Sequence, residues 1–410
     1  GLPSLSFNIK AECKLTRART AIMKLPHYEV KTPVFMPVGT QGTMKGLLPD
    51  QLEKLDCEII LGNTYHLGNR PGTEVFKKVG GLHNFMGWNR ALLTDSGGFQ
   101  MVSLLKLAEI TEDGVKFRSP YDDSEIMLTP EKSIEIQNCI GADIIMQLDD
   151  VVQTTFQDYD RIKEATERTS RWLDRCLEAH QRPTEQSIFP IVQGLLNKEL
   201  RTQSAKDHMT KNVNGFAIGG LSGGEAKDDF WPMVSLGTEI LDKHKPRYLM
   251  GVGVAIDLVV YYKLAYSNML KLIDIVRFGC ALINEGQLNL KQKKYQKDLN
   301  PIDKDCTCST CMNYTRAYLH CIVTGETVAC HLISIHNIAF QMRLMRTMRE
   351  NIENNTFPEF VVKFVNDVYP EKNYPSWVVN SLKSVGINPL DPPANIVKNN
   401  IGIFKNYHNY

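Results

Sequence analysis

The chain has 410 residues and a formal net charge of +1 at pH 7, and 43% of its residues are hydrophobic and 23% charged. This length suffices for one large domain of barrel size with an appendage, or for two to three ordinary domains. The composition excludes a mainly disordered, collagen-like or coiled-coil protein, and the charge balance argues against nucleic-acid binding by bulk charge, although a local basic patch stays open.

The sequence contains neither a stretch of about 18 apolar residues nor an N-terminal signal peptide. We therefore expect a protein that does not span a membrane and is not secreted. The chain does not begin with Met, which leaves open a true N-terminus, and a targeting segment on it, upstream. Its ten cysteines, in the absence of a signal peptide, indicate a reducing compartment rather than a disulfide scaffold.

Short apolar runs alternate with helical patterns along most of the chain. We expect strands at residues 33–39, 58–63, 92–95, 143–149, 189–193, 215–219 and 247–251, and a last one near 272–277. Helices are expected between them, among others at residues 130–140, 159–180, 197–209 and 229–241. This alternation is typical of parallel β/α units. Because no phosphate-binding fingerprint follows the first strand, it favours an α/β fold of the closed (β/α)8 type, a TIM barrel, over an open doubly wound sheet.

Three cysteines with the spacing Cys306-x-Cys308-x2-Cys311 predict a metal site. Three thiolates can close on one ion, and a structural zinc site needs a fourth ligand to become tetrahedral. The candidates for the fourth ligand are His320, His331 and His336. His336 lies in a helical pattern that could return it to the cysteines, and closed ligation of this kind implies a structural role for the ion.

These patterns divide the chain into four parts. We expect the barrel at residues 1–285, completed by C-terminal helices, and a zinc-binding subdomain inserted at residues 286–345. A helical region is expected at residues 346–387. Residues 388–410, with their prolines and asparagines, are predicted to be a poorly ordered tail.

Polar residues follow several of the predicted strands at the same end. They are Asp95 after the third strand, Asp149 after the fourth, Gln193 after the fifth and Gly219-Gly220 after the sixth. The carboxyl ends of barrel strands face one mouth, so we expect these residues to converge there. Paired carboxylates at such a mouth can divide acid–base work from ligand binding. Taken singly, each Asp could equally be a helix N-cap.

The residues at this mouth suit a flat ligand with both donors and acceptors. Gly97 and Gly98 allow close approach of the backbone, and Phe99 could stack on a ring. A carboxylate, the Gln193 amide and bare glycine N–H groups match the edge of guanine, with a sugar, a phosphate or no ligand as the alternatives. Met250 fits a core position better than a ring-facing one.

A basic run occupies residues 291–297 and contains four lysines and one tyrosine. It could contact phosphates, and a solvated loop is the alternative.

Several ordered motifs resemble those of the tRNA-guanine transglycosylase family, and its eukaryotic branch in particular. The motifs are residues 33–40 (PVFMPVGT), 61–67 (LGNTYHL), 94–101 (TDSGGFQM), 216–221 (FAIGGL) and 248–253 (YLMGVG), together with the cysteine cluster. The resemblance runs from about residue 11 to residue 387. It implies a (β/α)8 barrel with a zinc-binding subdomain near its end.

The resemblance also implies an activity, which is base exchange in tRNA through a covalent intermediate. An Asp attacks C1′ of the nucleotide, guanine leaves, and a modified base attacks the intermediate. The eukaryotic likeness, including Val151 after Asp149-Asp150, implies that queuine enters at wobble position 34 of tRNAs with GUN anticodons.

Residue roles carry over from the same resemblance. Asp95 would handle the proton of the base, and Phe99 and Met250 would cover its two faces. The implied base contacts are Asp95, Ser96, Gly97, Gly98, Phe99, Asp149, Gln193, Gly219, Gly220 and Met250. The implied RNA contacts are Gly251, Val252, Gly253, Val254, Ala255, Ile256 and Asp257. The implied zinc ligands are Cys306, Cys308, Cys311 and His336.

One segment departs from the family pattern. The family carries Asp-Met-Phe-Asp-Cys-Val-x-Pro-Thr-Arg, in which the second Asp is the nucleophile and Pro-Thr-Arg helps to read the wobble region. Residues 267–279 here (SNMLKLIDIVRFG) are about two residues shorter and lack Pro-Thr-Arg. One alignment places Lys271 at the nucleophile position, which a lysine cannot fill as an ester-forming group, and another leaves Asp274 as the nearest carboxylate.

Three explanations of this departure stay open: an altered gene reading or splice choice at residues 267–277, an inactive homologue that binds RNA or a partner, and rescue by Asp274. A metal-dependent hydrolase is disfavoured, because no cluster with catalytic-metal spacing lies at the strand ends. The resemblance further implies a heterodimer with a related non-catalytic subunit. It also implies a cytoplasmic location, with the mitochondrial outer membrane as a second expected site.

Overall fold

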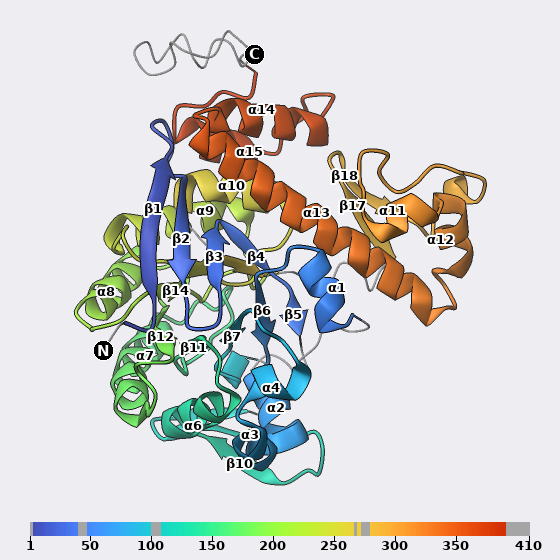
Figure 1. Ribbon diagram of the computed structural model, residues 1–410. Coiled ribbons are helices and arrows are strands. Elements are labelled where there is room, and N and C mark those ends of the chain that lie inside the picture. Colours follow the sequence, from blue (N-terminus) through green and yellow to red (C-terminus); the bar gives the residue numbers. More distant parts are fainter. Residues whose placement is uncertain (1–2, 40–46, 100–107, 266–268, 272–278, 391–410) are drawn as a thin grey trace.

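The computed structural model describes residues 3–39, 47–99, 108–265, 269–271 and 279–390. Parallel strands pair in a closed ring of eight positions, which confirms the predicted (β/α)8 barrel (Figure 1). In order around the ring, the strands are β4 (Val34–Met36) with β5 (Val38–Gly39), β6 (Ile59–Gly62), β7 (Ala91–Thr94), β11 (Ile144–Met146), β12 (Ser187–Phe189) with β13 (Ile191–Val192), β14 (Phe216–Ile218), β15 (Arg247–Leu249) and β16 (Met269–Lys271).

Two strand positions are split by proline. Pro37 separates β4 from β5 and Pro190 separates β12 from β13, since proline has no N–H to donate to a neighbouring strand. The carbonyls of both prolines still accept hydrogen bonds from the neighbouring strands. Leu61 N lies 2.9 Å from Pro37 O, and Ala217 N lies 2.8 Å from Pro190 O. Each split strand therefore pairs with one neighbour before the proline and with the other after it, and the ring stays closed.

The eighth strand was predicted near residues 272–277, which lie outside the described residues. In the described part of the chain the eighth barrel position is occupied by β16 at Met269–Lys271, directly before them. Backbone pairing aligns Met269 with Tyr248 and Val34, and Lys271 with Met36. Pairing with two neighbours at once fixes this register.

Alternate residues of the strands face the barrel interior and the surrounding helices, as a pleated strand requires. The interior is filled by large apolar side chains, among them Met36, Leu61, Leu93, Met146 and Tyr248. Residues at the intervening positions pack under the helices. The barrel is therefore a packed core rather than a pore, and only its two ends are open to function.

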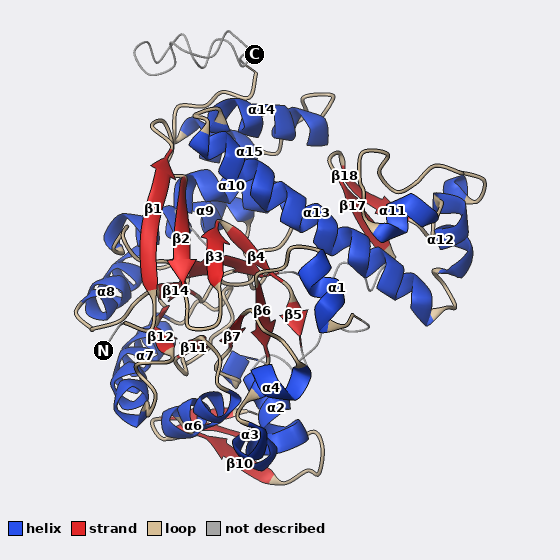
Figure 2. Cartoon of the chain, in the orientation of Figure 1, coloured by secondary structure: helices blue, strands red, loops and turns tan. Residues whose placement is uncertain are grey.

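Helices follow the strands and form the outer layer (Figure 2). They are α1 (Pro49–Lys54), α2 (Thr64–Leu67), the turn η1 (Gly68–Gly72), α3 (Thr73–Val79), α4 (Leu82–Met86), α6 (Pro130–Ile140), α7 (Tyr159–Ala179), α8 (Lys198–Met209), α9 (Lys227–Ile240) and α10 (Ala255–Ala265). Side-chain caps at Thr129, Asp158 and Asn197 begin three of them. All four helices predicted between the strands are present, within two residues at each end.

Two three-stranded antiparallel sheets were not predicted, and neither was a two-stranded one near the C-terminus. The first three-stranded sheet contains β1 (Ser6–Glu12), β2 (Arg19–Lys24) and β3 (Glu29–Thr32), and the second contains β8 (Glu109–Thr111), β9 (Gly114–Arg118) and β10 (Glu125–Leu128). Met23 and Val30 of the first sheet join the apolar cluster of the barrel interior. This sheet therefore closes the amino end of the barrel, which leaves the carboxyl end as the free mouth.

The C-terminal part forms a separate unit beside the barrel (Figure 1). It contains β17 (Cys280–Ile283), β18 (Gly286–Asn289), the turn η3 (Lys293–Tyr295), α11 (Ser309–Asn313), α12 (Arg316–Ile322) and α13 (Thr327–Glu353). Helices α14 (Phe357–Val368) and α15 (Ser376–Lys383) follow and pack on α9 and α10. The predicted boundary after residue 285 falls in the β17–β18 turn, and most of the predicted tail, residues 391–410, lies outside the described residues. No described helix is long and apolar enough to cross a membrane.

Candidate active site and metal centre

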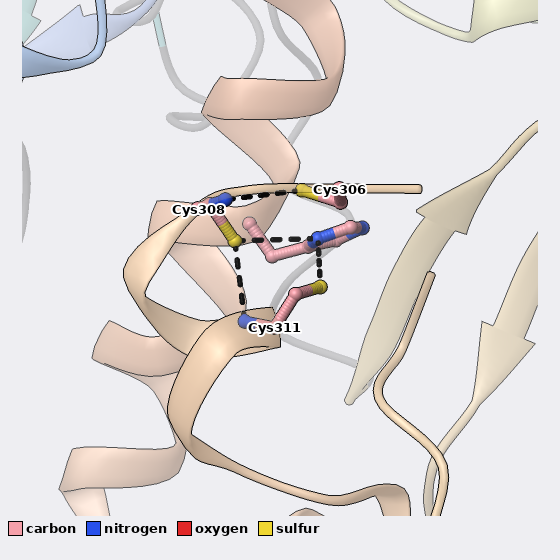
Figure 3. A group of neighbouring side chains, drawn as sticks. Cys306, Cys308 and Cys311 are labelled. Carbon is pink, nitrogen blue, oxygen red and sulfur yellow. Dashed lines mark hydrogen bonds between the residues drawn. The ribbon is translucent and has the colours of Figure 1, made fainter. Parts of the chain in front are cut away.

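Cys306, Cys308, Cys311 and His336 form a buried cluster in the C-terminal unit. Their candidate ligand atoms all lie within 4.8 Å of one another. Cys311 Sγ is 3.2 Å and Cys308 Sγ 3.7 Å from His336 Nδ1, and Figure 3 shows the three cysteines turned toward one centre. Three thiol sulfurs and one imidazole nitrogen at these separations fit the donor set of a closed tetrahedral metal site.

Local structure orients these ligands. Cys308 caps α11, and its Sγ accepts from Cys311 N at 3.4 Å. On α13, the Nε2 of His336 lies 2.7 Å from Leu282 O of β17, so Nε2 donates and Nδ1 is left to face the sulfurs. His320 instead contacts Leu290 O at 2.7 Å, so of the three candidate histidines in the described chain only His336 joins the cluster.

A second group of potential ligands, which the sequence analysis missed, contains His27, His83 and Asp143. The two imidazole rings stack in parallel with their centroids 3.5 Å apart. Nitrogen lone pairs lie in the ring planes, so those of parallel stacked rings do not converge on one ion. Asp143 is buried and accepts from His27 Nδ1 at 2.8 Å and from Leu92 N at 2.9 Å. This group therefore joins the loop before β3 to strands β7 and β11 at the amino end of the barrel.

At the opposite, carboxyl end of the barrel, the predicted base-contact residues follow five successive strands. Asp95 follows β7, Asp149 comes shortly after β11, Gln193 follows β13, Gly219 follows β14, and Met250 follows β15. These strands are neighbours in the ring. The predicted site residues therefore lie along one continuous arc of the barrel mouth.

Asp95 is held by backbone and side-chain N–H groups. Its Oδ1 accepts from Thr64 N at 3.0 Å and from Gly97 N at 3.2 Å, and its Oδ2 accepts from Asn63 Nδ2 at 3.2 Å. These donors fix the carboxylate in one orientation and stabilise its negative charge. Asn63 and Thr64 belong to one of the sequence motifs, but their contact with Asp95 joins the ends of β6 and β7 and could not be read from the sequence.

Asp149 is a buried carboxyl without a cation beside it in the described chain. Among the described residues its one side-chain partner is Gln193, whose Nε2 donates to Oδ2 at 2.5 Å. Burial raises the pKa of Asp149 to about 7, and the charge of Asp150 adds to this rise. Asp150 itself is paired with Arg161 at 2.6 Å and Arg168 at 2.9 Å. Two adjacent carboxyls therefore differ: Asp150 is a structural ion, and Asp149 is available to a ligand.

Three glycines of the arc have no room for a side chain. A Cβ on Gly98 would lie 2.6 Å from Leu148 Cδ1, and a Cβ on Gly219 would lie 2.5 Å from Ile191 Cγ2. On Gly220, whose φ is +68°, it would lie 2.4 Å from Gln193 Oε1. Glycine therefore lets the backbone pass directly beside the Gln193 amide.

The other predicted base contacts differ in accessibility. Phe99 is 56% exposed, so its ring has accessible surface on which a ligand could stack. Met250 is half-buried above the barrel core. Ser96 is buried, and its Oγ accepts from Gly98 N at 3.2 Å, so its side chain shapes the loop. Among these three, Phe99 and Met250 retain accessible surface for a ring.

The predicted RNA-contact segment follows β15. Five of its seven residues are buried, and only Gly251 and Val254 are partly exposed. Gly253 O accepts from Gln341 Nε2 of α13 at 3.0 Å, and Asp257 Oδ1 accepts from Lys227 Nζ at 2.5 Å. Any RNA contact from this segment would therefore come mainly from its backbone and from its two exposed residues.

The possible nucleophile Asp274 lies outside the described residues. Strand β16 ends at Lys271, and residues 272–278 follow it. The lysines of the basic run at 291–297 are exposed, but its tyrosine, Tyr295, is 5% exposed and therefore cannot stack on a base.

The model of the queuine tRNA-ribosyltransferase family matches residues 13–370 of this chain. The chain belongs to the queuine tRNA-ribosyltransferase family. Members of this family include the catalytic subunit of Schizosaccharomyces pombe, which is 50% identical over 403 residues, or 95% of this chain and 98% of that protein. The catalytic subunit of Caenorhabditis elegans is 51% identical over 387 residues, or 90% of this chain and 96% of that protein.

A bacterial member of the family is also similar. The queuine tRNA-ribosyltransferase of Bacillus subtilis is 46% identical over 357 residues, or 86% of this chain and 93% of that protein. The likeness thus spans the barrel and the metal-cluster unit together, and it confirms the resemblance drawn from the motifs.

Proposed function

We propose that this chain is a pentosyltransferase that exchanges guanine for queuine at wobble position 34 of tRNAs with GUN anticodons. The observation that carries this proposal is the Asp149–Gln193 pair, at 2.5 Å, between Asp95 and the Gly219-Gly220 backbone in a chain of this family. A carboxylate accepts from the N1–H and 2-amino groups of guanine, and amide or backbone N–H groups donate to its O6. The arc offers both kinds of group on adjacent strands.

Each residue has a distinct task in this proposal. Asp149 and Gln193 read the base edge together with the backbone of Gly220, and Phe99 and Met250 cover the two faces of the ring. Asp95 takes the proton of the incoming base or returns one to the leaving guanine. The remaining base contacts are Ser96, Gly97, Gly98 and Gly219.

The covalent step needs a carboxylate nucleophile, and we assign it to Asp274. Its carboxylate forms a bond to C1′ as the bond from C1′ to N9 of guanine breaks, and the incoming base then displaces the carboxylate. The backbone of Gly251, Val252, Gly253, Val254, Ala255, Ile256 and Asp257 would contact the RNA.

The decisive experiment is mass analysis of the chain after incubation with a GUN tRNA and a guanine analogue that traps the covalent intermediate. We expect an RNA adduct that protease digestion maps to Asp274 and that Asp274→Asn abolishes. The same tRNA with adenine at position 34 is the control. Noncovalent tRNA binding without any adduct, in the presence of the partner subunit, would instead identify an inactive RNA-binding homologue.

Base affinity should rise with pH, because Asp149 must be ionised to accept from guanine. With a pKa of about 7 in the free protein, affinity should grow about tenfold per pH unit below 7 and level off above about pH 8. Asp149→Asn should lower the affinity and remove this dependence, as titration calorimetry at several pH values would show. Asp158→Asn, which alters the exposed N-cap of α7, should keep the wild-type profile.

The raised pKa of Asp149 also makes the folded protein less stable as the pH rises. The pKa of Asp149 is about 7 in the folded protein and about 4 in the unfolded chain, so the folded state holds an extra proton between these values. The free energy of unfolding should therefore fall through this window, by up to about 4 kcal/mol. Asp149→Asn should remove that decrease, and an unchanged pH dependence of unfolding would contradict the raised pKa.

The metal, the partner and the location complete the proposal. We assign structural Zn²⁺ to the Cys306, Cys308, Cys311 and His336 cluster, because three thiolates and one imidazole suit this ion. We assign the protein to the cytoplasm, with association with the mitochondrial outer membrane as a second site, and to a heterodimer with a related non-catalytic subunit. The S. pombe and C. elegans relatives, named as catalytic subunits, support that pairing.

A further inference from the structure

Arg201 of α8 is a buried cation at the barrel mouth. It is 1% exposed, and its side chain donates to backbone carbonyls, at 2.5 Å from Nε to Leu195 O and 2.6 Å from Nη2 to Gly219 O. In the described part of the chain it forms no ion pair, and its Nη1 has no hydrogen-bond partner. Burial lowers the pKa of Arg201 to about 9, so it remains protonated at neutral pH.

The two carbonyls belong to two different loops of the mouth. Leu195 lies after β13, two residues beyond Gln193, and Gly219 lies after β14. Both loops turn through the left-handed region, with φ of +120° at Gly194, +46° at Leu195 and +68° at Gly220. A leucine rarely adopts such a backbone, so outside contacts must hold it there. Arg201 supplies one contact to each loop and joins them.

The bond to Gly219 O also fixes the direction of the next N–H. The Gly219–Gly220 peptide is trans, so its C=O and N–H point in opposite directions. Because the C=O points at the guanidinium, the Gly220 N–H points away from it. This N–H makes no hydrogen bond to another residue of the described chain. The Gln193 amide lies directly beside Gly220, since a Cβ there would be 2.4 Å from Gln193 Oε1.

We propose that Arg201 is a positioning residue, which holds the Gly219–Gly220 peptide so that the Gly220 N–H donates to O6 of the bound base. This inference rests on the proposed function, because it assumes that the arc binds guanine. Arg201 does not touch the base itself. A preset donor needs no reorganisation on binding, so loss of Arg201 should weaken the contact at O6 specifically.

The test compares guanine with 2-aminopurine, which lacks O6 and the N1–H, in binding to the purified chain. Loss of the N1–H contact to Asp149 is common to all variants and cancels when their preferences are compared. Wild-type protein should prefer guanine, and Arg201→Met should reduce that preference by about 10- to 100-fold, with most of the change in guanine affinity. A general loss of stability would instead weaken both bases equally. Arg201→Lys can reach only one of the two carbonyls and should give an intermediate preference.

A matched control is available in Arg247, another buried arginine that donates to backbone carbonyls, at Thr238 O and Leu241 O. It lies at the amino end of β15, away from the mouth, so Arg247→Met should keep the wild-type preference even if it lowers stability. If Arg201→Met does not fold, the preference of Arg201→Lys for guanine over 2-aminopurine is the deciding measurement. A wild-type preference in the folded Arg201 variants would overturn the role of Arg201, whereas wild-type protein that binds no guanine would overturn the proposed function.

Discussion

Replacing Asp95 with asparagine should lower kcat for base exchange by about 100- to 10,000-fold, the range expected for loss of a positioned acid or base. The asparagine side chain would keep an oxygen that accepts from Thr64 N and Gly97 N, so the loop should keep its shape. An NH2 group would replace Oδ2, so the hydrogen bond that Asn63 Nδ2 donates to Oδ2 would be lost. This loss should lower the free energy of unfolding by about 1 kcal/mol. Single-turnover kinetics and thermal unfolding would separate the two effects.

Asp242→Asn is the control for this substitution. Asp242 also accepts from a backbone N–H, that of His244 at 2.9 Å, but it lies before β15 at the amino end of the barrel. We expect wild-type kcat in this variant. Comparable rates for the two variants would show that Asp95 has no part in proton transfer.

Removal of the metal should unfold the C-terminal unit. Metal binding of this kind contributes on the order of 10 kcal/mol or more in small zinc domains, and here β17 and α13 meet through the His336 ligand. Cys311→Ser, or chelation of the wild-type metal, should lower Tm by about 10 °C or more and remove one metal equivalent per chain. Elemental analysis would measure the metal content, and calorimetry would measure Tm. The affinity for tRNA should fall together with both.

Cys330→Ser serves as the matched control, because Cys330 lies on the same helix as His336 but is exposed and outside the cluster. It should keep its metal and its Tm. Base affinity should persist after metal loss, since the arc at the barrel mouth is built by the strands. If Cys311→Ser retained a full metal equivalent, the proposed ligand set would be wrong.

The parts of the structure that follow from local pattern are those that the sequence predicts. The strand and helix alternation located seven of the eight barrel positions and four helices, because apolar runs and capping residues act within a few residues of one another. The eighth strand was predicted at residues 272–277, which lie outside the described residues, and the antiparallel sheets were missed. Their short strands depend on distant partners, as when Met23 and Val30 fill the end of the barrel.

The sequence by itself determined the chemistry that is present: two carboxylates, an amide and glycines after successive strands, and three cysteines at metal spacing. Only the tertiary structure decided how these groups act. It selected His336 among three histidines, separated Asp149 from the ion-paired Asp150, and brought Arg201 to carbonyls of two loops. Burial, and hydrogen bonds between residues distant in the chain, set these outcomes, and both arise only when the strands close into the barrel.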